Sequence, residues 1–559
     1  MLITEEQLKN IIIKDGLADE ESFRQIKEYA KNADLSVAEA LIEKDIVTDE
    51  NLGLLIADIL KYPFIVLSKT SIPSDVFYII PEKIARKQKV IAFSKDANGV
   101  KLAMADPSNL ELQKMISKKI SMPVIPHLAT EQDIYNALRI YRQDLQKAFD
   151  EMIKKESGGR GIASDVPIAK IVDMLINYAY QDRASDIHIE PEEKDSLVRF
   201  RIDGILHDVL VLPKSLHDQI ITRIKILSRL RTDEHLSPQD GKMRIVILDK
   251  EELDIRVSIL PIADGEKGVL RLLASRQQTF SFINLGMREK DLKKVQDSYS
   301  KSYGMILSTG PTGSGKTTSI YAIIKILNVR EKNITTIEDP IEYRIKGVNQ
   351  INVNPKTNLT FASGLRSILR QDPNIIFVGE IRDSETAGIA VNASLTGHLV
   401  VSTLHTNDAA TALPRLMDMH VEPFLVASTV NVIIAQRLVR KICDMCKVTR
   451  EITEEELVKN LPRDSVIKHF GNRRNVLVYQ GKGCKVCHLT GYSGRVGLFE
   501  VLEVTKTIRE LIVRRSDSDV IAQKAMQEGM TTMLDDGLEK VVRGITTIEE
   551  VLRVTKVQT

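Results

Sequence analysis

The sequence lacks an excess of charge of either sign. Lys and Arg together number 78 and Asp and Glu together 76, which gives a formal net charge of +2. A long-range field that recruits nucleic acid or anionic lipid requires a clear positive excess. The composition therefore excludes recruitment by the charge of the whole chain and leaves only local basic patches for such contacts.

Long apolar runs are also missing. Hydrophobic residues make up 43% of the chain, yet no stretch reaches the roughly 18 uninterrupted apolar residues that a spanning helix requires. Residues 1–6 show no basic segment followed by an apolar core, so they do not resemble a secretory signal. We therefore expect a cytoplasmic protein with no transmembrane segment of its own, which other proteins hold at the membrane if it works there.

Cysteine is scarce, and its positions are informative. The four cysteines form two C-x₂-C pairs, Cys443 with Cys446 and Cys484 with Cys487. Four thiolates in two such pairs can enclose one Zn²⁺ ion, and a closed set of four ligands is structural because no position remains for water. Disulfides and a redox pair are the alternatives, but a cytosolic setting disfavours stable disulfides and no thioredoxin-like context surrounds either pair. We predict a zinc site.

The length of 559 residues is too great for one compact core, so the chain is expected to divide into several domains. Gly and Ser are concentrated between residues 156 and 164, which predicts a flexible linker there. The predicted order is an N-terminal helical and α/β module, a linker, an α+β domain and a P-loop domain, with bounds 1–145, 146–165, 166–285 and 286–559.

Hydrophobic periodicity assigns structure to these parts. In the first, apolar residues recur at three- and four-residue spacing, as in amphipathic helices over 36–46 and 48–59. In the third, a helix over 167–181 precedes alternating strand patterns at 186–190, 197–204, 252–260 and 268–273. From residue 304 onward, apolar strands such as 305–307 and 375–378 alternate with helical stretches, which predicts a mostly parallel sheet covered on both faces.

A phosphate-binding loop follows the first of these apolar strands. The segment matches the G-x-x-x-x-G-K-[ST] pattern between a strand and a helix, with the residues Gly310, Pro311, Thr312, Gly313, Ser314, Gly315, Lys316, Thr317 and Thr318. In such a loop the backbone N–H groups surround the β-phosphate, Lys316 reaches the β- and γ-phosphates, and the Thr317 hydroxyl ligates Mg²⁺. The sequence therefore predicts binding of ATP and Mg²⁺.

Hydrolysis also needs groups that orient water and support the metal. Two acidic clusters are candidates, with Glu338 in residues 335–342 and Glu380 directly after the apolar run 375–378. Glu380 emerges at the carboxyl end of a strand, where open α/β sheets hold their ligands. A solvated carboxylate at a strand end is the alternative for either cluster taken alone.

Histidines flank another apolar strand, at His398 and His405. A lone histidine is usually structural. His405 follows the strand in the same sheet, so its ring could donate a hydrogen bond to the γ-phosphate and respond to its loss. His398 is the weaker candidate.

Together these segments resemble the type II secretion and type IV pilus assembly ATPases, within the secretion ATPase superfamily. The resemblance covers the loop 310–318, the acidic segments ending at Glu342 and Glu380, and the histidine segment. It further includes the segments 435–441, 495–500 and 546–553, and before the loop 184–191, 199–204 and 254–258.

The resemblance implies a RecA-like P-loop core preceded by an α+β (PAS-like) domain. It implies a homo-hexameric ring with ATP between the core of one subunit and the preceding domain of its neighbour. That domain would supply arginines in trans, at Arg256, Arg271 and Arg201. Glu380 and Glu338 would share the metal and water chemistry. The core would contain a tetracysteine insert at 441–490 and C-terminal helices at 500–559.

The resemblance also implies that the N-terminal module docks on an inner-membrane platform protein of the pilus or secretion machinery. Relatives of this module bind cyclic di-GMP through a motif starting Arg-Leu-Gly. No segment of this chain carries that tripeptide, so we do not predict this ligand.

Four functions follow from these patterns. The favoured one is an ATP hydrolase that powers type IV pilus assembly, and a motor for a type II secretion pseudopilus is the close alternative. A nucleic-acid translocase is disfavoured by the balanced charge. A non-hydrolysing scaffold is disfavoured by the presence of Lys316, Thr317, Glu338 and Glu380.

Overall fold

The computed structural model of the chain describes residues 3–33, 35–70, 72–141, 145–156, 167–247, 252–273, 281–471 and 473–555. The chain forms two compact units. The first unit comprises Met1–Ile80, Lys89–Ile134 and Thr279–Thr559, and the second comprises Pro81–Gln88 and Tyr135–Gln278. Among the described residues, no helix combines the length and apolar character needed to cross a membrane.

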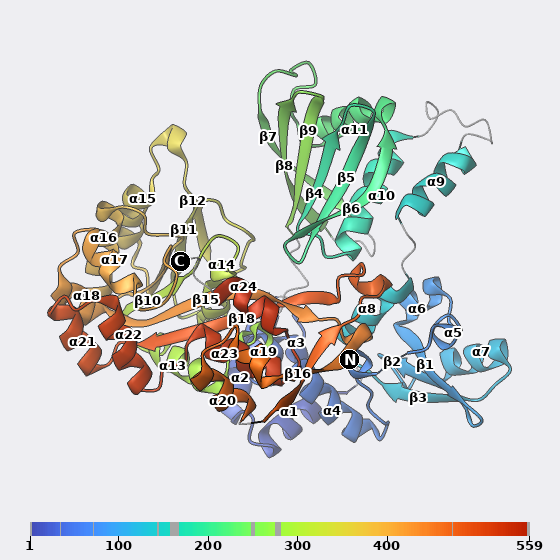
Figure 1. Ribbon diagram of the computed structural model, residues 1–559, viewed down its shortest axis with the longest axis horizontal. Coiled ribbons are helices and arrows are strands. Elements are labelled where there is room, and N and C mark those ends of the chain that lie inside the picture. Colours follow the sequence, from blue (N-terminus) through green and yellow to red (C-terminus); the bar gives the residue numbers. More distant parts are fainter. Residues whose placement is uncertain are drawn as a thin grey trace. The chain divides into compact units, whose positions relative to one another are not determined.

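A seven-stranded sheet forms the centre of the first unit, with the strand order β12-β11-β13-β14-β10-β15-β18 (Figure 1). Neighbouring strands from β12 to β15 are parallel, and β18 runs antiparallel to β15. The bounds are β10 (Gly304–Thr309), β11 (Ile334–Glu338), β12 (Asn349–Asn352), β13 (Ile375–Val378), β14 (Leu399–Leu404), β15 (Val430–Ile442) and β18 (Tyr492–Glu503). The mostly parallel sheet that the sequence predicts is confirmed.

Helices cover both faces of this sheet. On β10, Met305 and Leu307 belong to one core cluster, whereas Ile306 belongs to a second cluster on the opposite face. The first cluster includes α15 (Phe361–Ile368), α16 (Ser384–Leu395), α17 (Ala412–Asp418), α18 (Pro423–Thr429) and the C-terminal helices α21 (Lys506–Val513), α22 (Ser518–Gln527), α23 (Met533–Val542) and α24 (Ile548–Thr555). The second includes α12 (Phe282–Leu285), α13 (Glu289–Tyr299) and α14 (Lys316–Leu327). Burial on both faces explains why these strands are apolar throughout.

The N-terminal part of the first unit is helical and then α/β, as predicted. Its first helices are α1 (Glu5–Lys14), α2 (Glu20–Ala33), α3 (Val37–Glu43) and α4 (Asp49–Leu60). Thr4 and Ser36 begin α1 and α3 with capping boxes, which satisfy backbone N–H groups that the helix leaves unpaired. A three-stranded sheet of β1 (Val90–Asp96), β2 (Gly99–Met104) and β3 (Val124–Leu128) follows, together with α7 (Leu110–Ile120).

Within the first unit, the end of α3 contacts the far end of α14. The Lys44 ammonium donates to the backbone carbonyls of Lys325 at 2.9 Å and of Ile326 at 2.8 Å. Glu43 pairs with the Lys325 ammonium at 2.7 Å, and burial lowers the pKa of Lys44 to about 8. A cation at a helix C-terminus satisfies its last carbonyls and complements its dipole. The N-terminal module thus stabilises the end of α14 that lies opposite the phosphate-binding loop.

The second unit contains a six-stranded antiparallel sheet, with the order β6-β5-β4-β9-β8-β7 (Figure 1). The strands are β4 (Asp186–Pro191), β5 (Asp195–Ile202), β6 (Ile205–Pro213), β7 (Gln239–Val246), β8 (Glu252–Ile262) and β9 (Gly265–Leu273). Alternate residues such as Ile187, Phe200 and Leu270 pack in one core with α10 (Ile168–Gln181) and α11 (Lys214–Leu227). The α+β class and the alternating strands predicted for this region are confirmed, and the alternation leaves a second, polar face.

The first half of the predicted flexible linker 146–165 is a helix in the structure. Residues of this half form α9 (Leu145–Glu156), because Leu145 and Phe149 are buried in the core of the second unit at helical spacing. The Gly- and Ser-rich half, residues 157–165, lies outside the described part of the chain. The other predicted domain boundaries stay predictions.

Candidate functional site

The phosphate-binding loop connects β10 to α14 through glycines in unusual conformations. Gly310, Gly313 and Gly315 have φ angles of 144°, 78° and 90°, which side-chain-bearing residues rarely adopt. A Cβ atom on Gly310 would lie 2.5 Å from the backbone oxygen of Gln436, in the neighbouring strand β15. The loop therefore passes too close to β15 for any residue other than glycine at this point.

Side chains fix the shape of the loop. The Gln436 amide donates to the carbonyl of Ser314 at 2.8 Å. The Lys316 ammonium donates to the carbonyls of Gly310 at 2.8 Å and Pro311 at 3.0 Å, so its charge lies at the inner side of the turn. Burial lowers the pKa of Lys316, and the nearby Glu380 carboxylate acts in the opposite direction.

The loop fits a phosphate group. The Ser314 hydroxyl is buried and has no hydrogen-bond partner among the residues that the structure describes. Pro311, Thr312, Gly313 and Ser314 line a pocket of about 630 Å³. The first turn of α14 begins directly after the loop, with Thr317 and Thr318 half-buried behind Lys316. A helix N-terminus with converging N–H groups and an ammonium group favours an anion.

Glu380 and His405 lie together beside this loop. The strands β13, β14 and β10 are adjacent and parallel, so the segments that follow them leave the sheet at the same edge. The Glu380 carboxylate contacts His405 Nε2 at 3.1 Å and Arg382 Nη2 at 2.6 Å. The Glu380 side chain is 12% exposed and that of His405 is 45% exposed. Glu380 is thus a largely enclosed carboxylate within the electrostatic reach of Lys316.

Glu338, at the end of β11, has different surroundings. Its carboxylate is buried and accepts hydrogen bonds from Thr336 Oγ1 at 2.6 Å, from Gln350 Nε2 at 3.2 Å and from the Tyr321 hydroxyl. Burial raises its pKa, against the effect of these hydrogen bonds. Tyr321 lies on α14, so Glu338 is tied to the helix that follows the loop. The two predicted acids therefore occupy distinct environments, one locked and one next to the loop.

His398 lies at the other edge of the sheet. It precedes β14, and its Nδ1 is 3.0 Å from the carbonyl oxygen of Ala393 at the end of α16. The amino end of a parallel strand points away from the edge where the loop lies. This position gives His398 a local contact and no place beside Glu380 and Lys316.

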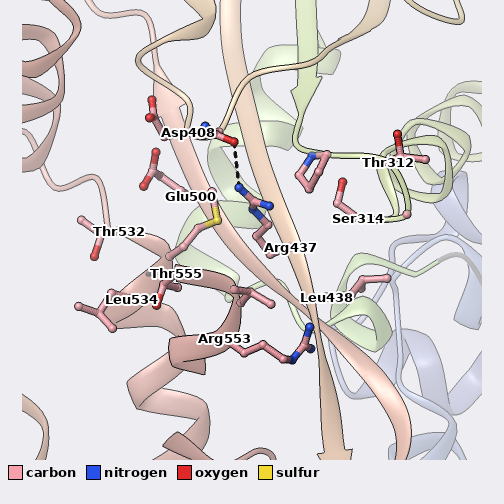
Figure 2. A pocket seen from close by; sticks show the side chains of 15 residues that line it. Thr312, Ser314, Asp408, Arg437, Leu438, Glu500, Thr532, Leu534, Arg553 and Thr555 are labelled. Atoms are coloured by element: carbon pink, nitrogen blue, oxygen red, sulfur yellow. Dashed lines mark hydrogen bonds between the residues drawn. The ribbon is translucent and has the colours of Figure 1, made fainter. Parts of the chain in front are cut away.

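Sequence reasoning missed the wall of the pocket that lies opposite the loop and contains Arg437. Figure 2 shows Arg437 of β15 near Glu500 of β18, opposite the loop residues Thr312 and Ser314. Arg437 Nη2 donates to the Asn407 side chain at 3.1 Å, and burial lowers the pKa of Arg437. Charged residues within the strand segments, Arg437 and Glu500, were the available signal, because a buried charge needs a partner or a ligand.

The three predicted trans arginines lie in one row of the second unit. Asp186 of β4 is directly opposite Arg201 of β5 and Arg271 of β9, and Arg271 is opposite Arg256 of β8. Directly opposite residues share a face of the sheet. The structure therefore brings all three arginines together on the polar face, away from α10 and α11.

The four cysteines meet in one cluster of the first unit. The Sγ atoms are 3.8 Å apart between Cys443 and Cys484, 3.9 Å between Cys446 and Cys487, and 3.7 Å between Cys484 and Cys487. Four sulfurs placed about 2.3 Å from a common zinc ion would be about 3.8 Å apart. All four sulfurs lie within 4.8 Å of one another, and these distances are too long for S–S bonds. The cluster has the dimensions of a metal site.

Backbone groups around the cysteines support this arrangement. The N–H groups of Cys484 and Gly491 point to Cys487 Sγ, at 3.1 Å and 3.3 Å. N–H groups directed at sulfur stabilise thiolates. The cysteines flank a two-stranded sheet of β16 (Lys447–Thr453) and β17 (Asn475–Gly481), which carries α19 (Glu454–Val458) and α20 (Arg463–Phe470). This insert projects from the segment between β15 and β18.

Comparison with protein families identifies the core. The family model described as "Type II/IV secretion system protein" matches residues 162–553. The chain belongs to this secretion ATPase family. A second model, described as "MshEN domain", matches residues 60–148. The family membership predicted from the motifs, and with it the prediction of an ATPase, is confirmed.

Curated relatives and a solved structure support this family membership and fold. Type IV pilus assembly ATPase PilB of Myxococcus xanthus (strain DK1622) is 35% identical over 562 residues, which cover 98% of each chain. Type II secretion system protein E of Pseudomonas aeruginosa is 45% identical over 392 residues, covering 70% of this chain and 76% of that protein. The X-ray structure of the Legionella pneumophila ATPase DotB matches with a TM-score of 0.52 at 20% identity, over 69% of this chain and 95% of that chain. This last likeness supports the RecA-like fold.

Replacing Lys316 tests the loop. We expect Lys316→Ala to lower ATP turnover by about 100-fold or more, because it removes the ammonium that lies inside the turn. Phosphate release by the purified protein measures this. Lys506→Ala, at an exposed position on α21, is the matched control and should remain active. Normal turnover of a folded Lys316→Ala protein would contradict the role of the loop.

The two acids are compared by amide substitution. Glu380→Gln keeps the side-chain volume but removes the charge, so ATP should still bind while turnover falls by about 100-fold or more. We expect Glu338→Gln to be milder in turnover and to lower thermal stability, because its carboxylate is buried among three donors. Nucleotide binding by fluorescence and phosphate release are measured in parallel. A severe Glu338→Gln beside a mild Glu380→Gln would reverse this order.

For the cysteine cluster, elemental analysis is expected to find about one zinc per chain, as one closed tetrahedral site requires. Cys443→Ser and Cys484→Ser should each lose the metal and lower the melting temperature, because metal binding contributes folding free energy. Metal-free protein that melts at the same temperature as the untreated protein would exclude a structural metal.

Proposed function

We propose that this chain is a cytoplasmic ATPase that assembles as a homo-hexamer and powers type IV pilus assembly. The observation that carries the proposal is the near full-length similarity to a type IV pilus assembly ATPase, 98% of each chain, combined with the loop and Glu380 at one edge of the sheet. The type II secretion relative is more similar per residue but covers 70% of this chain. A type II secretion motor is therefore the second candidate.

In this proposal the loop 310–318 holds the phosphates of ATP. Lys316 contacts the β- and γ-phosphates, and the Thr317 hydroxyl is a ligand of Mg²⁺. The metal, when bound, neutralises the charge that develops on the β- and γ-oxygens. The support comes from the glycine geometry, the buried Ser314 hydroxyl and the ammonium group inside the turn.

Glu380 orients and deprotonates the attacking water. Its proximity to Lys316 and its enclosed carboxylate support this role. His405, hydrogen-bonded to Glu380, responds to the γ-phosphate. Glu338 supports the metal and, through Tyr321, keeps α14 in place.

The arginine row of the second unit acts on the nucleotide of a neighbouring subunit. Positive charge supplied in trans stabilises the transferring phosphoryl group and makes hydrolysis depend on ring assembly. Arg271 is the leading candidate because its side chain is 60% exposed, against 36% for Arg201. Arg256 is its direct neighbour in the row.

The remaining parts serve attachment and stability. The N-terminal module, which overlaps the region matched by the MshEN model, docks on an inner-membrane platform protein. Zn²⁺ held by the four cysteines stabilises the insert. No nucleic acid takes part in the reaction.

A deletion strain tests the biological role. Loss of surface pili with normal release of secreted enzymes would support pilus assembly, and the opposite result would support type II secretion. Complementation with the wild-type gene should restore the phenotype, and complementation with Lys316→Ala should not. Stimulation of the ATPase by DNA, with a steep salt dependence, would instead favour a translocase.

A mixing experiment tests the trans arginines. Rings of Arg271→Ala and rings of Lys316→Ala are each expected to be inactive. In mixed rings, some interfaces pair an intact Lys316 with an intact Arg271 from the neighbour, so part of the activity should return. Phosphate release is measured after mixed assembly is confirmed by two different tags. Absence of recovery would show that Arg271 serves its own subunit or only its fold.

A further inference from the structure

One carboxylate stands within the row of cations on the polar face of the second unit. In strand order the row runs Lys242, Arg256, Arg271, Asp186 and Arg201, each directly opposite the next. Like charges directly opposite each other destabilise a sheet. Asp186 separates Arg271 from Arg201, so its position decides where these two guanidinium groups can lie.

Asp186 is held more firmly than the arginines. Its side chain is 4% exposed. Arg271 Nε donates to Oδ1 at 2.9 Å, and Arg201 Nε lies 3.4 Å from Oδ2. The Ser185 hydroxyl donates to Oδ2 at 2.8 Å. The carboxylate is therefore a fixed point, with both oxygens engaged and its orientation set by the preceding residue.

The two arginines differ in how they are attached. Arg201 Nη1 also donates to the carbonyl of Gly204 at 3.3 Å, in the turn between β5 and β6. Both arginines approach Asp186 through Nε, the nitrogen nearest the stem, but Arg271 is closer and has the more exposed side chain. The Nε contact to Asp186 thereby sets the direction of the Arg271 stem, and the side chain as a whole stays 60% exposed.

We propose that Asp186 is a positioning residue for Arg271 that orients its guanidinium towards the nucleotide phosphates of a neighbouring subunit. The inference rests on the proposed trans role of Arg271. A long side chain with free rotation would lose conformational entropy on every contact, and a pre-set stem reduces that loss. Arg201 supports this arrangement by pairing with the second oxygen of the Asp186 carboxylate, because the charge of a buried carboxylate must be compensated.

The chain provides a matched control four residues away on the same strand. Glu190 lies on the same strand and face, is 13% exposed, and bridges Arg199 Nη2 at 2.6 Å and Lys267 Nζ at 2.6 Å. It is thus a second enclosed carboxylate between two cations, but outside the row that contains Arg271. Loss of a buried bridging carboxylate as such should affect both positions equally.

The test compares Asp186→Asn, Glu190→Gln, Arg271→Ala and the double variant Asp186→Asn/Arg271→Ala in the full-length hexamer. We expect Asp186→Asn to lower kcat by about 10- to 100-fold, as a displaced catalytic contact does, with an unchanged KM for ATP and a melting temperature lowered no more than in Glu190→Gln. Glu190→Gln should keep kcat within about twofold, and the double variant should be no slower than Arg271→Ala. Ser185→Ala, which loosens the carboxylate without removing charge, should give a smaller fall in kcat.

The outcomes separate the two ideas. If Arg271→Ala is inactive while folded Asp186→Asn and Ser185→Ala keep full kcat, the positioning role is wrong and the trans arginine stands. If Arg271→Ala is itself active, the proposed function of the row is wrong. Two results would show that Asp186 serves only the fold. One is an equal loss of kcat and of thermal stability in Asp186→Asn and Glu190→Gln. The other is a double variant in which the effects of Asp186→Asn and Arg271→Ala on kcat multiply. Should Asp186→Asn fail to fold, Ser185→Ala alone decides.

Discussion

The close approach of the loop 310–318 to strand β15 constrains the whole site. The loop must turn where β10 ends between two parallel neighbours, and a side chain on Gly310 would collide with the Gln436 carbonyl. Gln436 in turn donates to the carbonyl of Ser314. Glycine conformation, sheet position and one amide therefore determine together the shape of the loop and, with it, where the Lys316 ammonium lies.

Parallel pairing then brings the other groups to the loop. β14 and β13 continue the sheet beside β10, so the residues that follow them, His405 and Glu380, reach the same edge without further support. Glu338 lies one strand farther away and is enclosed by hydrogen bonds, one of them from the Tyr321 hydroxyl on α14. The sheet thus places Glu380 beside the loop and Glu338 in contact with α14. The C-terminal end of α14 is capped by Lys44, so this helix is tied to groups outside it near its middle, at Tyr321, and at its end.

The second unit uses its sheet differently. One face packs on α10 and α11, and the other carries a row of five charged residues, four of them cations, in register across five strands. An antiparallel sheet with one covered face can present such a row, because alternate residues are free of packing demands. The only acid of the row, Asp186, is nearly buried, so the exposed part of the row is positive. A positive surface of this kind suits contact with phosphate groups.

The sequence by itself determined the classes of structure and the local chemistry. The loop motif, the apolar parallel strands, the alternating strands of the second unit and the paired cysteines depend on spacing along the chain, and the fold and family that they predict are confirmed. Contacts between distant segments were decided only by the tertiary structure. The helix over residues 145–156 belongs to a core because Phe149 packs in one cluster with apolar residues far along the chain. The different surroundings of Glu338 and Glu380, the wall formed by Arg437, and the alignment of Arg256, Arg271 and Asp186 all depend on which strands pair and in which register. Turns and hydrophobic patterns fix the register within each hairpin, but the pairing of β4 with β9, which aligns Asp186 with Arg271, joins segments that are distant along the chain.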